Sequence, residues 1–420
     1  MKYNFYSLKG MNDILPFESD KWNILNEIIN KWLNIYGYKN IITPIMEKTK
    51  LFNKGIGETT DIIEKEMYTF INKEKESLSL RPEITSGIIR SVIENNMLYQ
   101  KTQKLYSIGP VFRQEKPQKG RYRQFNQVNV EALGFKGPDI DAEIIVMISR
   151  LWKILGIKNI KLQINSIGQL KERYIYKYAL IKYLKKNFDL LNSYEKVNVI
   201  YNPLRILDSK NKFVKSIIYD APNLLDFLSE KSFLHLEKIC NILNYSGVKY
   251  NLNTKLVRGI DYYNLTVFEW IMNDVKFNKT ICGGGRYDNL SELLGGKKCH
   301  AIGFGIGLER LIYIWKRKNQ LNRFNCDIYM IYEGKLAKQI AYILSEKLRN
   351  YGISVIVNFN ESSFKKQFKN ANKSGALNAI ILGNYEISNK IINIKPLRVN
   401  SKNYFQYKIP IIRLIKMLEN

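Results

Sequence analysis

Residues 108–133 constrain the fold more than any other part of the chain, because their pattern is typical of two strands joined by a long basic loop. The return strand alternates, so its side chains lie on two opposite faces. One face carries Phe125, Gln127, Asn129 and Glu131. Amide and carboxylate groups removed from water need partners, so this face beside Arg113 predicts the wall of a ligand pocket. A solvated outer face of an antiparallel sheet explains the same alternation, and the pattern alone leaves both interpretations open.

The charge of the chain favours a polyanionic partner. Its 420 residues are 45% hydrophobic, enough for the cores of roughly three domains. The 66 basic and 38 acidic residues give a net charge of +28, which suits nucleic acid or nucleotide phosphates. Lysine, asparagine, isoleucine and tyrosine are all abundant, as they are when an AT-rich genome biases codon use, so part of this charge can lack a function.

The cysteines and histidines argue against a zinc site. Cys240, Cys282, Cys299 and Cys326 form no CxxC pair, and the chain has only 2 histidines, so we expect a reducing compartment. The first residues lack the apolar core of a signal peptide. No apolar run approaches the roughly 18 residues of a membrane span, so we expect a cytoplasmic protein that does not enter a membrane.

Near the N-terminus, the spacing of apolar residues between Asp20 and Tyr36 predicts an amphipathic helix that ends at Gly37. A strand is predicted over residues 40–46, and Pro44 places it at a sheet edge because proline cannot donate to the ladder. Such a helix either belongs to the core or marks a subunit interface, and the pattern does not decide between the two.

The chain divides into a first domain with an insertion, followed by a second domain. Residues 1–169 and 245–317 form the first domain, because strand character returns over residues 248–253 and 266–270. Residues 170–244 between them read as a helical insertion with lysine and tyrosine on its helices. A basic polar linker is predicted over residues 316–325.

Residues 326–420 are predicted to form the second domain. Strands are expected over 326–332, 353–358 and 376–382, and helices over 336–348, 364–374 and after Pro410. This alternating order predicts a small α/β domain with a largely parallel sheet.

Residues 301–310 place glycine at every second position of a strand that runs into a helix. One face of that strand, formed by Gly303, Gly305 and Gly307, has no side chains, so a flat ring can approach the backbone. Arg310 lies in the first turn of the helix, where the helix dipole favours phosphate. Close packing of the helix on the sheet is the alternative reason for the glycines.

Two shorter segments combine charged and hydrogen-bonding residues. Arg258 precedes the adjacent Tyr262 and Tyr263, although adjacent tyrosines are also common on the surface of a chain with 28 tyrosines. Glu83 and Thr85 lie two positions apart after a proline, which puts both on one side if the segment is extended.

Together these segments resemble class II aminoacyl-tRNA synthetases. Pro44 behind a long helix and the runs 112–115 and 305–310 look like the three signature motifs of that class. Residues 256–264 and 81–83 are similar to the histidine-specific motifs of the histidyl-tRNA synthetase family. Residues 10–13, 65–70, 202–205 and 208–210 are similar to bacterial members of the family. The resemblance implies an α+β fold, with the antiparallel-sheet catalytic domain of class II synthetases, a helical insertion and a C-terminal α/β anticodon-binding domain.

The resemblance also implies a reaction. Members join histidine to ATP, which gives histidyl-adenylate and pyrophosphate, and then pass the histidyl group to tRNA(His). Both steps build negative charge on oxygen, which pre-placed cations stabilise. By motif position the catalytic residues are Arg113 and Arg258, which flank the α-phosphate. Mg²⁺ is expected to bridge the outgoing phosphates, and the enzyme is expected to be a homodimer.

Motif positions assign the remaining roles. For histidine the resemblance implies Glu83, Ile84, Thr85, Gln127, Glu131, Arg258, Tyr262 and Tyr263. For ATP it implies Arg113, Glu115, Arg121, Phe125, Gly305, Gly307 and Arg310, with Phe125 and Arg310 on either side of adenine. For the acceptor end of the tRNA it implies Lys116, Gln118 and Arg123, with Lys119 in the same basic loop. The carboxylate and phenols suit an imidazole, which offers one donor and one acceptor.

Three positions depart from the family pattern. Ile84 and Asn129 stand where relatives have glycine, and their bulk is expected to narrow the histidine site. Lys116 stands where relatives have arginine and lacks its bidentate fork. We interpret these differences as drift that lowers efficiency without abolishing activity.

Two other classes of protein share much of this pattern. A regulatory paralogue of the same fold binds histidine without charging tRNA, but such a paralogue is expected to lack the domain over residues 326–420. An RNA-binding scaffold with an inactive site is the second class. The presence of Glu83, Arg113, Arg258 and Arg310 argues against it.

Overall fold

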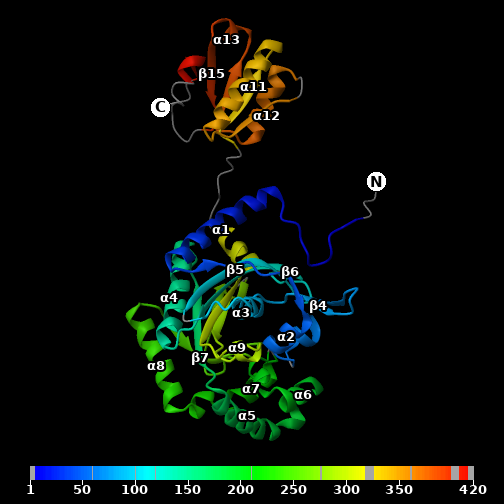
Figure 1. Cartoon of the computed structure of the whole chain (residues 1–420), viewed down its shortest axis with the longest axis vertical. Helices are drawn as coiled ribbons and strands as arrows, with labels where there is room; N and C mark the ends of the chain where they lie inside the picture. Colours follow the sequence, from blue (N-terminus) through cyan, green and yellow to red (C-terminus); the bar gives the residue numbers. More distant parts are fainter. Residues whose placement is uncertain are drawn as a thin grey trace. The chain divides into compact units, whose positions relative to one another are not determined.

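The computed structural model forms two compact units, Met1–Asn319 and Gln320–Asn420, each with its own sheet (Figure 1). The residues that the structure describes are 5–58, 60–99, 101–118, 120–209, 211–274, 277–316, 326–359, 362–398 and 406–414.

An eight-stranded sheet forms the centre of the first unit as described, in the order β1-β5-β6-β11-β10-β9-β7-β8. The inner strands run antiparallel, and the edge strands β1 and β8 pair in parallel with their neighbours. The strands are β1 (Lys39–Asn40), β5 (Gln103–Phe112), β6 (Gln124–Leu133), β7 (Ile160–Ser166), β8 (Tyr250–Leu252), β9 (Asn264–Asp274), β10 (Phe277–Arg286) and β11 (Ala301–Gly307).

Strands β5 and β6 confirm the predicted hairpin, with Val111 opposite Phe125 and Gly109 opposite Gln127. On the other side of β6, the glycines of β11 oppose the polar residues of β6, because Gly303 pairs with Glu131, Gly305 with Asn129 and Gly307 with Gln127. Directly paired residues share a face of the sheet. The polar face of β6 and the bare face of β11 are therefore one continuous surface.

The strand predicted over residues 40–46 is wrong, because the chain passes from one sheet to another there. β1 belongs to the large sheet, whereas β2 belongs to a separate three-stranded sheet. Arg81 fixes the segment that passes between the two sheets. Its guanidinium donates to the carbonyl oxygens of Thr43 (3.1 Å) and Pro110 (2.8 Å). The small sheet comprises β2 (Met46–Lys48), β3 (Thr69–Ile71) and β4 (Ser77–Leu80).

Helix α1 (Pro16–Ile35) confirms the amphipathic helix and starts earlier than predicted, because proline suits the first turn. Its buried residues include Leu25, Ile29 and Trp32. The Trp32 indole donates to the carbonyl oxygen of Met147 (3.0 Å). The helix therefore belongs to the core of its own unit.

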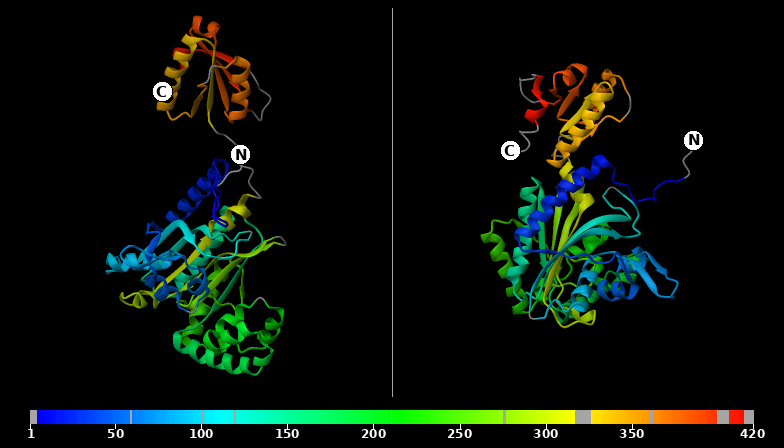
Figure 2. Two further views of the ribbon diagram at one scale, coloured as in Figure 1. Left: turned by 90° about the vertical axis from the view of Figure 1, so that its right-hand side faces the viewer. Right: turned by 45° about the horizontal axis from the view of Figure 1, so that its top comes forward.

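Between β7 and β8 the described residues form only helices, as the pattern of residues 170–244 predicts. Figure 2 shows α5, α6 and α7 gathered at one end of the unit. The last helix, α8, instead packs on α4, β7 and β9. These helices are α5 (Leu170–Lys185), η2 (Phe188–Leu190), α6 (Ser193–Tyr201), η3 (Pro203–Asp208), α7 (Lys212–Tyr219), η4 (Leu224–Phe227) and α8 (Glu230–Tyr245).

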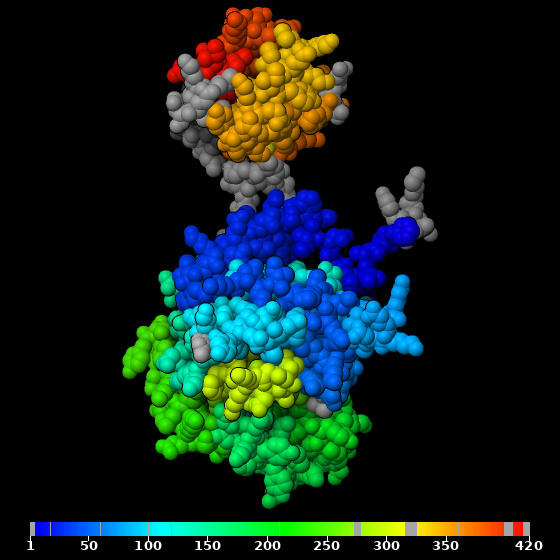
Figure 3. All heavy atoms as spheres, in the orientation of Figure 1, coloured from blue at the N-terminus to red at the C-terminus, as the bar shows by residue number. Residues whose placement is uncertain are grey.

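Among the other helices of the unit, α4 packs against α8, whereas α9 packs against α3, as the space-filling view shows in yellow-green and cyan (Figure 3). These other helices are α2 (Thr49–Ile56), η1 (Ile62–Glu66), α3 (Thr85–Glu94), α4 (Pro138–Ile154), α9 (Leu290–Leu293) and α10 (Leu308–Lys316).

The second unit has a five-stranded sheet in the order β13-β12-β14-β15-β16. Its first three strands are parallel and confirm the predicted order, but β15 and β16 pair antiparallel, so the sheet is mixed rather than largely parallel. The elements are β12 (Ile328–Tyr332), α11 (Lys335–Asn350), β13 (Val355–Val357), α12 (Phe364–Ser374), β14 (Asn378–Leu382), α13 (Asn384–Ser388), β15 (Ile391–Pro396) and β16 (Tyr407–Pro410).

Two predicted segments fall largely outside the described residues. The linker over residues 316–325 does so except for Lys316, which ends α10. Residues 411–414 are helical after Pro410, and the remainder of that predicted helix also lies outside. Among the described residues, no helix has the length and apolarity needed to cross a membrane.

Candidate active site

A cavity of about 410 Å³ lies over the polar face of β6 and the bare face of β11. This volume is typical of small-molecule sites. The pocket interpretation of the alternating strand is therefore correct, since Phe125, Gln127, Asn129 and Glu131 all line the cavity. The other predicted residues that line it are Glu83, Thr85, Arg113, Glu115, Arg121, Arg258, Tyr262, Tyr263, Gly305, Gly307 and Arg310.

Ile84 is not among the residues that line the cavity. Its side chain has no exposed area and packs in a hydrophobic core with Ile88 and Val111. Ile84 therefore cannot narrow the histidine site by its own bulk, because its side chain lies in the core. Sequence spacing missed this because Ile84 is the residue that precedes helix α3, so the segment is not extended.

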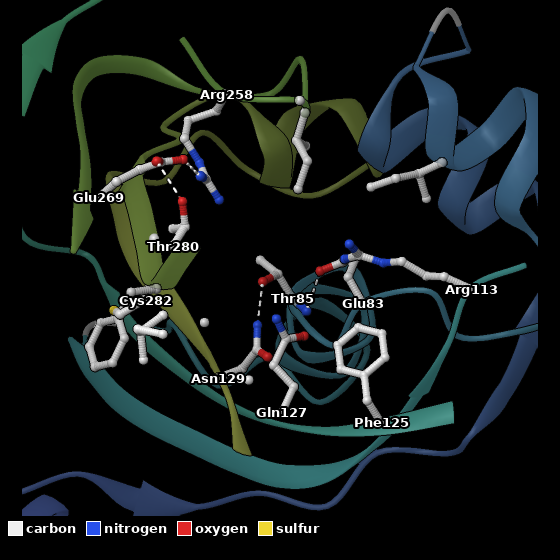
Figure 4. Close-up of a pocket in the computed structure, with 18 of the residues that line it drawn as sticks. Glu83, Thr85, Arg113, Phe125, Gln127, Asn129, Arg258, Glu269, Thr280 and Cys282 are labelled. Atoms are coloured by element: carbon white, nitrogen blue, oxygen red, sulfur yellow. Dashed lines mark hydrogen bonds and ion pairs between the residues drawn. The ribbon is translucent and has the colours of Figure 1, made fainter. Parts of the chain in front are cut away.

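Glu83 caps helix α3. Its Oε2 accepts a hydrogen bond from the backbone N–H of Thr85 (2.6 Å), and its Oε1 accepts one from the N–H of Ser86 (2.8 Å). The positive end of the helix dipole stabilises a carboxylate in this place. The cap holds Glu83 and Thr85 together at the cavity edge, where Figure 4 shows them side by side.

Glu131 lies at the centre of a buried hydrogen-bond chain. Its Oε1 accepts from the Thr85 hydroxyl (2.7 Å), and its Oε2 accepts from the Tyr287 hydroxyl. Burial raises the pKa of Glu131 to about 8, although these hydrogen bonds oppose the shift. A carboxyl group with this pKa can hold or release a proton near neutral pH, which suits a pocket for imidazole.

The tyrosines close this end of the cavity. The ring of Tyr262 lies 4.7 Å from that of Tyr263 and 5.3 Å from that of Tyr287. Helix α5 holds the same segment, because the Arg173 guanidinium donates to the Tyr263 carbonyl oxygen (2.6 Å). Sequence reasoning did not single out Tyr287, whose hydroxyl donates to Glu131.

Arg258 lies on the loop before β9 and points into the cavity beside Glu269 of β9 and Thr280 of β10 (Figure 4). It forms an ion pair with Glu269, whose Oε2 also accepts from the Thr280 hydroxyl (2.9 Å). Burial lowers the pKa of Arg258, but the charge of Glu269 outweighs it and raises that pKa. Gly283 leaves room for this group, since a Cβ there would lie 2.7 Å from a guanidinium nitrogen.

Sequence reasoning also missed Glu269 and Thr280. A usable signal was present, because Glu269 is a lone charged residue within the apolar run 267–270. A carboxylate in a buried strand needs a cationic partner.

Arg113 enters the cavity from the opposite side (Figure 4). Its Nε donates to the Pro82 carbonyl oxygen (2.9 Å), and its guanidinium carbon lies 5.5 Å from the centre of the Phe125 ring. At this distance the cation and the ring attract each other. Arg113 and Arg258 therefore present two fixed positive charges to one cavity.

The bare face of β11 is partly filled by its neighbour. A Cβ at Gly303 would lie 1.7 Å from Glu131 Oε2, and one at Gly305 would lie 2.6 Å from Gln127 Nε2. Only Gly307 has no other atom within 4 Å of that position. A flat ring can therefore approach the backbone at Gly307, whereas the side chains of β6 occupy the space beside Gly303 and Gly305.

Arg310 lies in the first turn of α10 and lines the cavity near Gly307. Its Nε donates to the Gly120 carbonyl oxygen (2.8 Å) and its Nη1 to the Thr280 carbonyl oxygen (2.7 Å). Arg310 thus joins the basic loop to β10.

The three residues predicted to contact tRNA lie on this loop and not among the cavity-lining residues. Lys116 and Gln118 are exposed, and Arg123 is half-buried with its Nε near the Glu115 carbonyl oxygen (3.4 Å). Arg121 lies 3.3 Å from the Glu115 carboxylate. Lys119 lies outside the described residues.

Two family models match the chain. Residues 10–311 match the model for histidyl-tRNA synthetase, and residues 327–420 match the model for the anticodon binding domain. The histidine–tRNA ligase of Bordetella avium is 49% identical over 417 residues, which is 99% of this chain and 97% of that protein. The ligase of Nitrosomonas eutropha is 46% identical over 417 residues, which is 99% of this chain and 98% of that protein.

Solved structures agree. The crystal structure of apo S. aureus histidyl-tRNA synthetase superposes with a TM-score of 0.83 at 33% identity, covering 99% of this chain and 100% of that one. An ATP phosphoribosyltransferase regulatory subunit/histidyl-tRNA synthetase from Bacillus halodurans gives a TM-score of 0.65 at 20% identity, with 91% and 99% covered, and shows a shared fold alone. By its full-length relatives and its two matched domains, this chain belongs to the histidyl-tRNA synthetase family.

Proposed function

We propose that this chain activates histidine with ATP and transfers it to tRNA(His). The observation that carries the proposal is the pair of guanidinium groups, Arg113 and Arg258, which enter one cavity from opposite sides (Figure 4). The cavity is joined on one chain to a domain of the anticodon-binding family over residues 327–420, which favours charging over a purely regulatory role.

In the activation step, the histidine carboxylate attacks the α-phosphorus of ATP and pyrophosphate leaves. Negative charge then grows on the non-bridging phosphate oxygens. Arg113 and Arg258 stabilise that charge, and their ion pair, carbonyl and ring contacts hold them in place before the reaction.

Histidine is recognised at the end of the cavity that holds Glu131 and the tyrosines. Neutral imidazole offers one N–H donor and one acceptor nitrogen, which a carboxylate and a phenol satisfy together. A buried polar pocket of this kind rejects amino acids that lack the hydrogen-bonding group by roughly 10⁴ to 10⁵.

The adenine of ATP lies between Phe125 and Arg310, over Gly307, where the backbone is open. Glu115 and Arg121 belong to the same part of the cavity lining.

Mg²⁺ fits this end of the cavity. Glu309 Oε1 accepts hydrogen bonds from the Asn126 backbone (2.8 Å) and side chain (3.1 Å), whereas its buried Oε2 has no hydrogen-bond partner among the described residues. Burial raises the pKa of Glu309 to about 7. The described residues contain no cluster of three or more potential metal ligands. Glu309 and Glu115 would hold Mg²⁺, which would neutralise charge on the phosphates of ATP.

The tRNA contacts both units of the chain. Lys116, Gln118 and Arg123 meet its acceptor end, and the second unit meets the anticodon. We also propose a homodimer in the cytoplasm, supported by the apolar side chains exposed around Pro44, where Ile42 is 85% and Met46 45% exposed.

Exchange of pyrophosphate into ATP, measured with each of the twenty amino acids in turn, tests the activation step. Histidine alone should support exchange, and exchange with another amino acid or with none would contradict the proposal. Charging of a tRNA(His) transcript with labelled histidine tests the second step, because a regulatory paralogue binds histidine but leaves the tRNA uncharged.

A further inference from the structure

Two amide oxygens on β6 lack partners beside the cavity. Gln127 Oε1 and Asn129 Oδ1 are both buried, and neither has a hydrogen-bond partner among the described residues. Only 4% of Asn129 is exposed. A buried acceptor without a donor is unfavourable, so these oxygens point to a ligand that brings donors.

When the Glu131 carboxyl is ionised, the hydrogen bonds around Thr85 determine which way the Asn129 amide is turned. The Thr85 hydroxyl has one hydrogen, and it donates this hydrogen to the Glu131 carboxylate (2.7 Å). The hydroxyl can therefore only accept from Asn129, whose Nδ2 lies 3.1 Å away. Since the amide nitrogen is used in this way, the free oxygen Oδ1 is left for the cavity that Asn129 lines.

We propose that Asn129 is a specificity-determining residue that accepts a hydrogen bond from the α-ammonium group of the amino-acid substrate, together with Gln127. The inference rests on the proposed function and adds a substrate contact to those that the family resemblance implies. Asn129 thus does more than narrow the site.

The order of residues along β6 selects the ammonium group. Alternate residues of a strand lie about 7 Å apart. A histidine whose ring meets Glu131 therefore extends its backbone groups past Asn129 toward Gln127. An ammonium group has three donors and no acceptor, so it matches two free oxygens, whereas the substrate carboxylate has only acceptors.

Asn129 has one alternative role, because it also supports Thr85 and through it Glu131. A series of ligands separates the two roles. Histidine and histidinol both carry the ammonium group and the imidazole, whereas 3-(imidazol-4-yl)propionate carries the imidazole and no ammonium group. Binding of each to the full chain is measured by isothermal titration calorimetry.

Asn129→Ala should weaken binding of histidine and histidinol by about tenfold or more, the usual effect of a lost hydrogen bond to a charged group. Binding of the imidazole propionate should change by less than about twofold. Asn129→Asp keeps an oxygen acceptor at this position and should retain the preference for ligands with the ammonium group. Equal losses for all three ligands would show that Asn129 acts only through Thr85, and unchanged affinities would also overturn the inference.

Ser107→Ala is the matched control. Ser107 pairs with Asn129 across the β5–β6 hairpin and is 2% exposed, but it does not line the cavity. It should leave all three affinities unchanged. If the alanine variant at 129 does not fold, Asn129→Gly gives the same comparison.

The two hypotheses fail in different ways. A native chain that shows no histidine-dependent pyrophosphate exchange contradicts the proposed function. A native chain that is active, with a variant at 129 that keeps its full preference for the ammonium group, contradicts this inference alone.

Discussion

Two arginines of the first unit, the buried Arg286 and the half-buried Arg258, lie in contrasting surroundings. Arg286 ends β10 and has all its guanidinium nitrogens bonded, to the carboxylates of Asp141 and Asp288 and to the carbonyl oxygens of Phe135 and Gly137. Arg258 is held by the single carboxylate of Glu269, and its Nε has no partner among the described residues. The first network is closed, whereas the second leaves donors for a ligand.

The carboxylates of the two regions show the same difference. Burial raises the pKa of Asp141, but the hydrogen bond to His235 and the charge and hydrogen bonds of Arg286 outweigh burial and hold that pKa below its ordinary value. Glu131 is equally buried without a bonded cation, and its pKa rises to about 8. A closed ionic network specifies the fold, whereas an incompletely paired one is available for binding and proton exchange.

Removing the cation of the closed network should have the largest effect. Arg286→Met leaves Asp141 and Asp288 buried without their partner, so we expect the free energy of unfolding to fall by about 3–5 kcal/mol. Urea denaturation measures this loss. Arg258→Met, at the open site, is the control and should cost much less stability. Equal losses for both variants would remove the distinction between the two regions.

Removing a cation of the open site should instead affect catalysis. Arg258→Ala or Arg113→Ala should slow histidyl-adenylate formation by about 10² to 10³, because each removes one donor to the charged transition state. Pyrophosphate exchange measures the rate. Arg349→Ala in the second unit, where Arg349 pairs with the exposed Glu346, should leave exchange unchanged. Native rates in both cavity variants would exclude the proposed catalytic role.

The pH dependence of stability should separate the two carboxylates. Between the ordinary pKa of 4.5 and about 8, the folded protein keeps a proton on Glu131 that the unfolded chain has lost. The free energy of unfolding therefore falls as pH rises across this window, and Glu131→Gln should flatten the fall. Asp141 acts in the opposite sense, because its pKa is lowered in the folded protein. Its contribution to the free energy of unfolding is therefore lost only as pH falls through that lowered pKa. Denaturant titrations at pH 5 and pH 8.5 test this, and an unchanged slope in Glu131→Gln would contradict it.

The smallest effect is expected at Lys116, which is exposed on the basic loop. Lys116→Ala should reduce the slope of log K against log salt for tRNA binding by about 0.7–0.9, the loss of one phosphate contact. Filter binding at several salt concentrations measures the slope. Lys48→Ala, which removes a 71% exposed lysine paired with Glu76, should not change it.

Patterns of local spacing predicted the fold well where side-chain alternation decides it. The hairpin of β5 and β6, helix α12 and the parallel strands of the second unit all follow from such patterns. The prediction of a strand over residues 40–46 failed, because only tertiary contacts such as those of Arg81 show that the chain passes from one sheet to another there. The strands β15 and β16 were missed for a similar reason, since their pairing depends on neighbours in space.

The candidate site shows the same limit. Motif positions located the two cavity arginines and the polar face of β6, because those residues lie in recognisable local patterns. They did not show that the Ile84 side chain packs in the core, and they missed Glu269 and Tyr287, whose roles depend on which side chain they meet across the sheet. Likewise, only the packed structure shows that the space beside Gly303 is taken by Glu131.

That arrangement of glycines on β11 restricts how the amino-acid preference of this enzyme can be redesigned. Any larger residue at Gly303 or Gly305 would collide with Glu131 or Gln127, the side chains proposed to contact the substrate, so changes there should destroy recognition before they can alter it. Substitutions of the cavity-lining residues on β6 do not create this collision. Libraries that randomise β6 above an unchanged β11 are therefore the ones from which new substrate preferences should emerge.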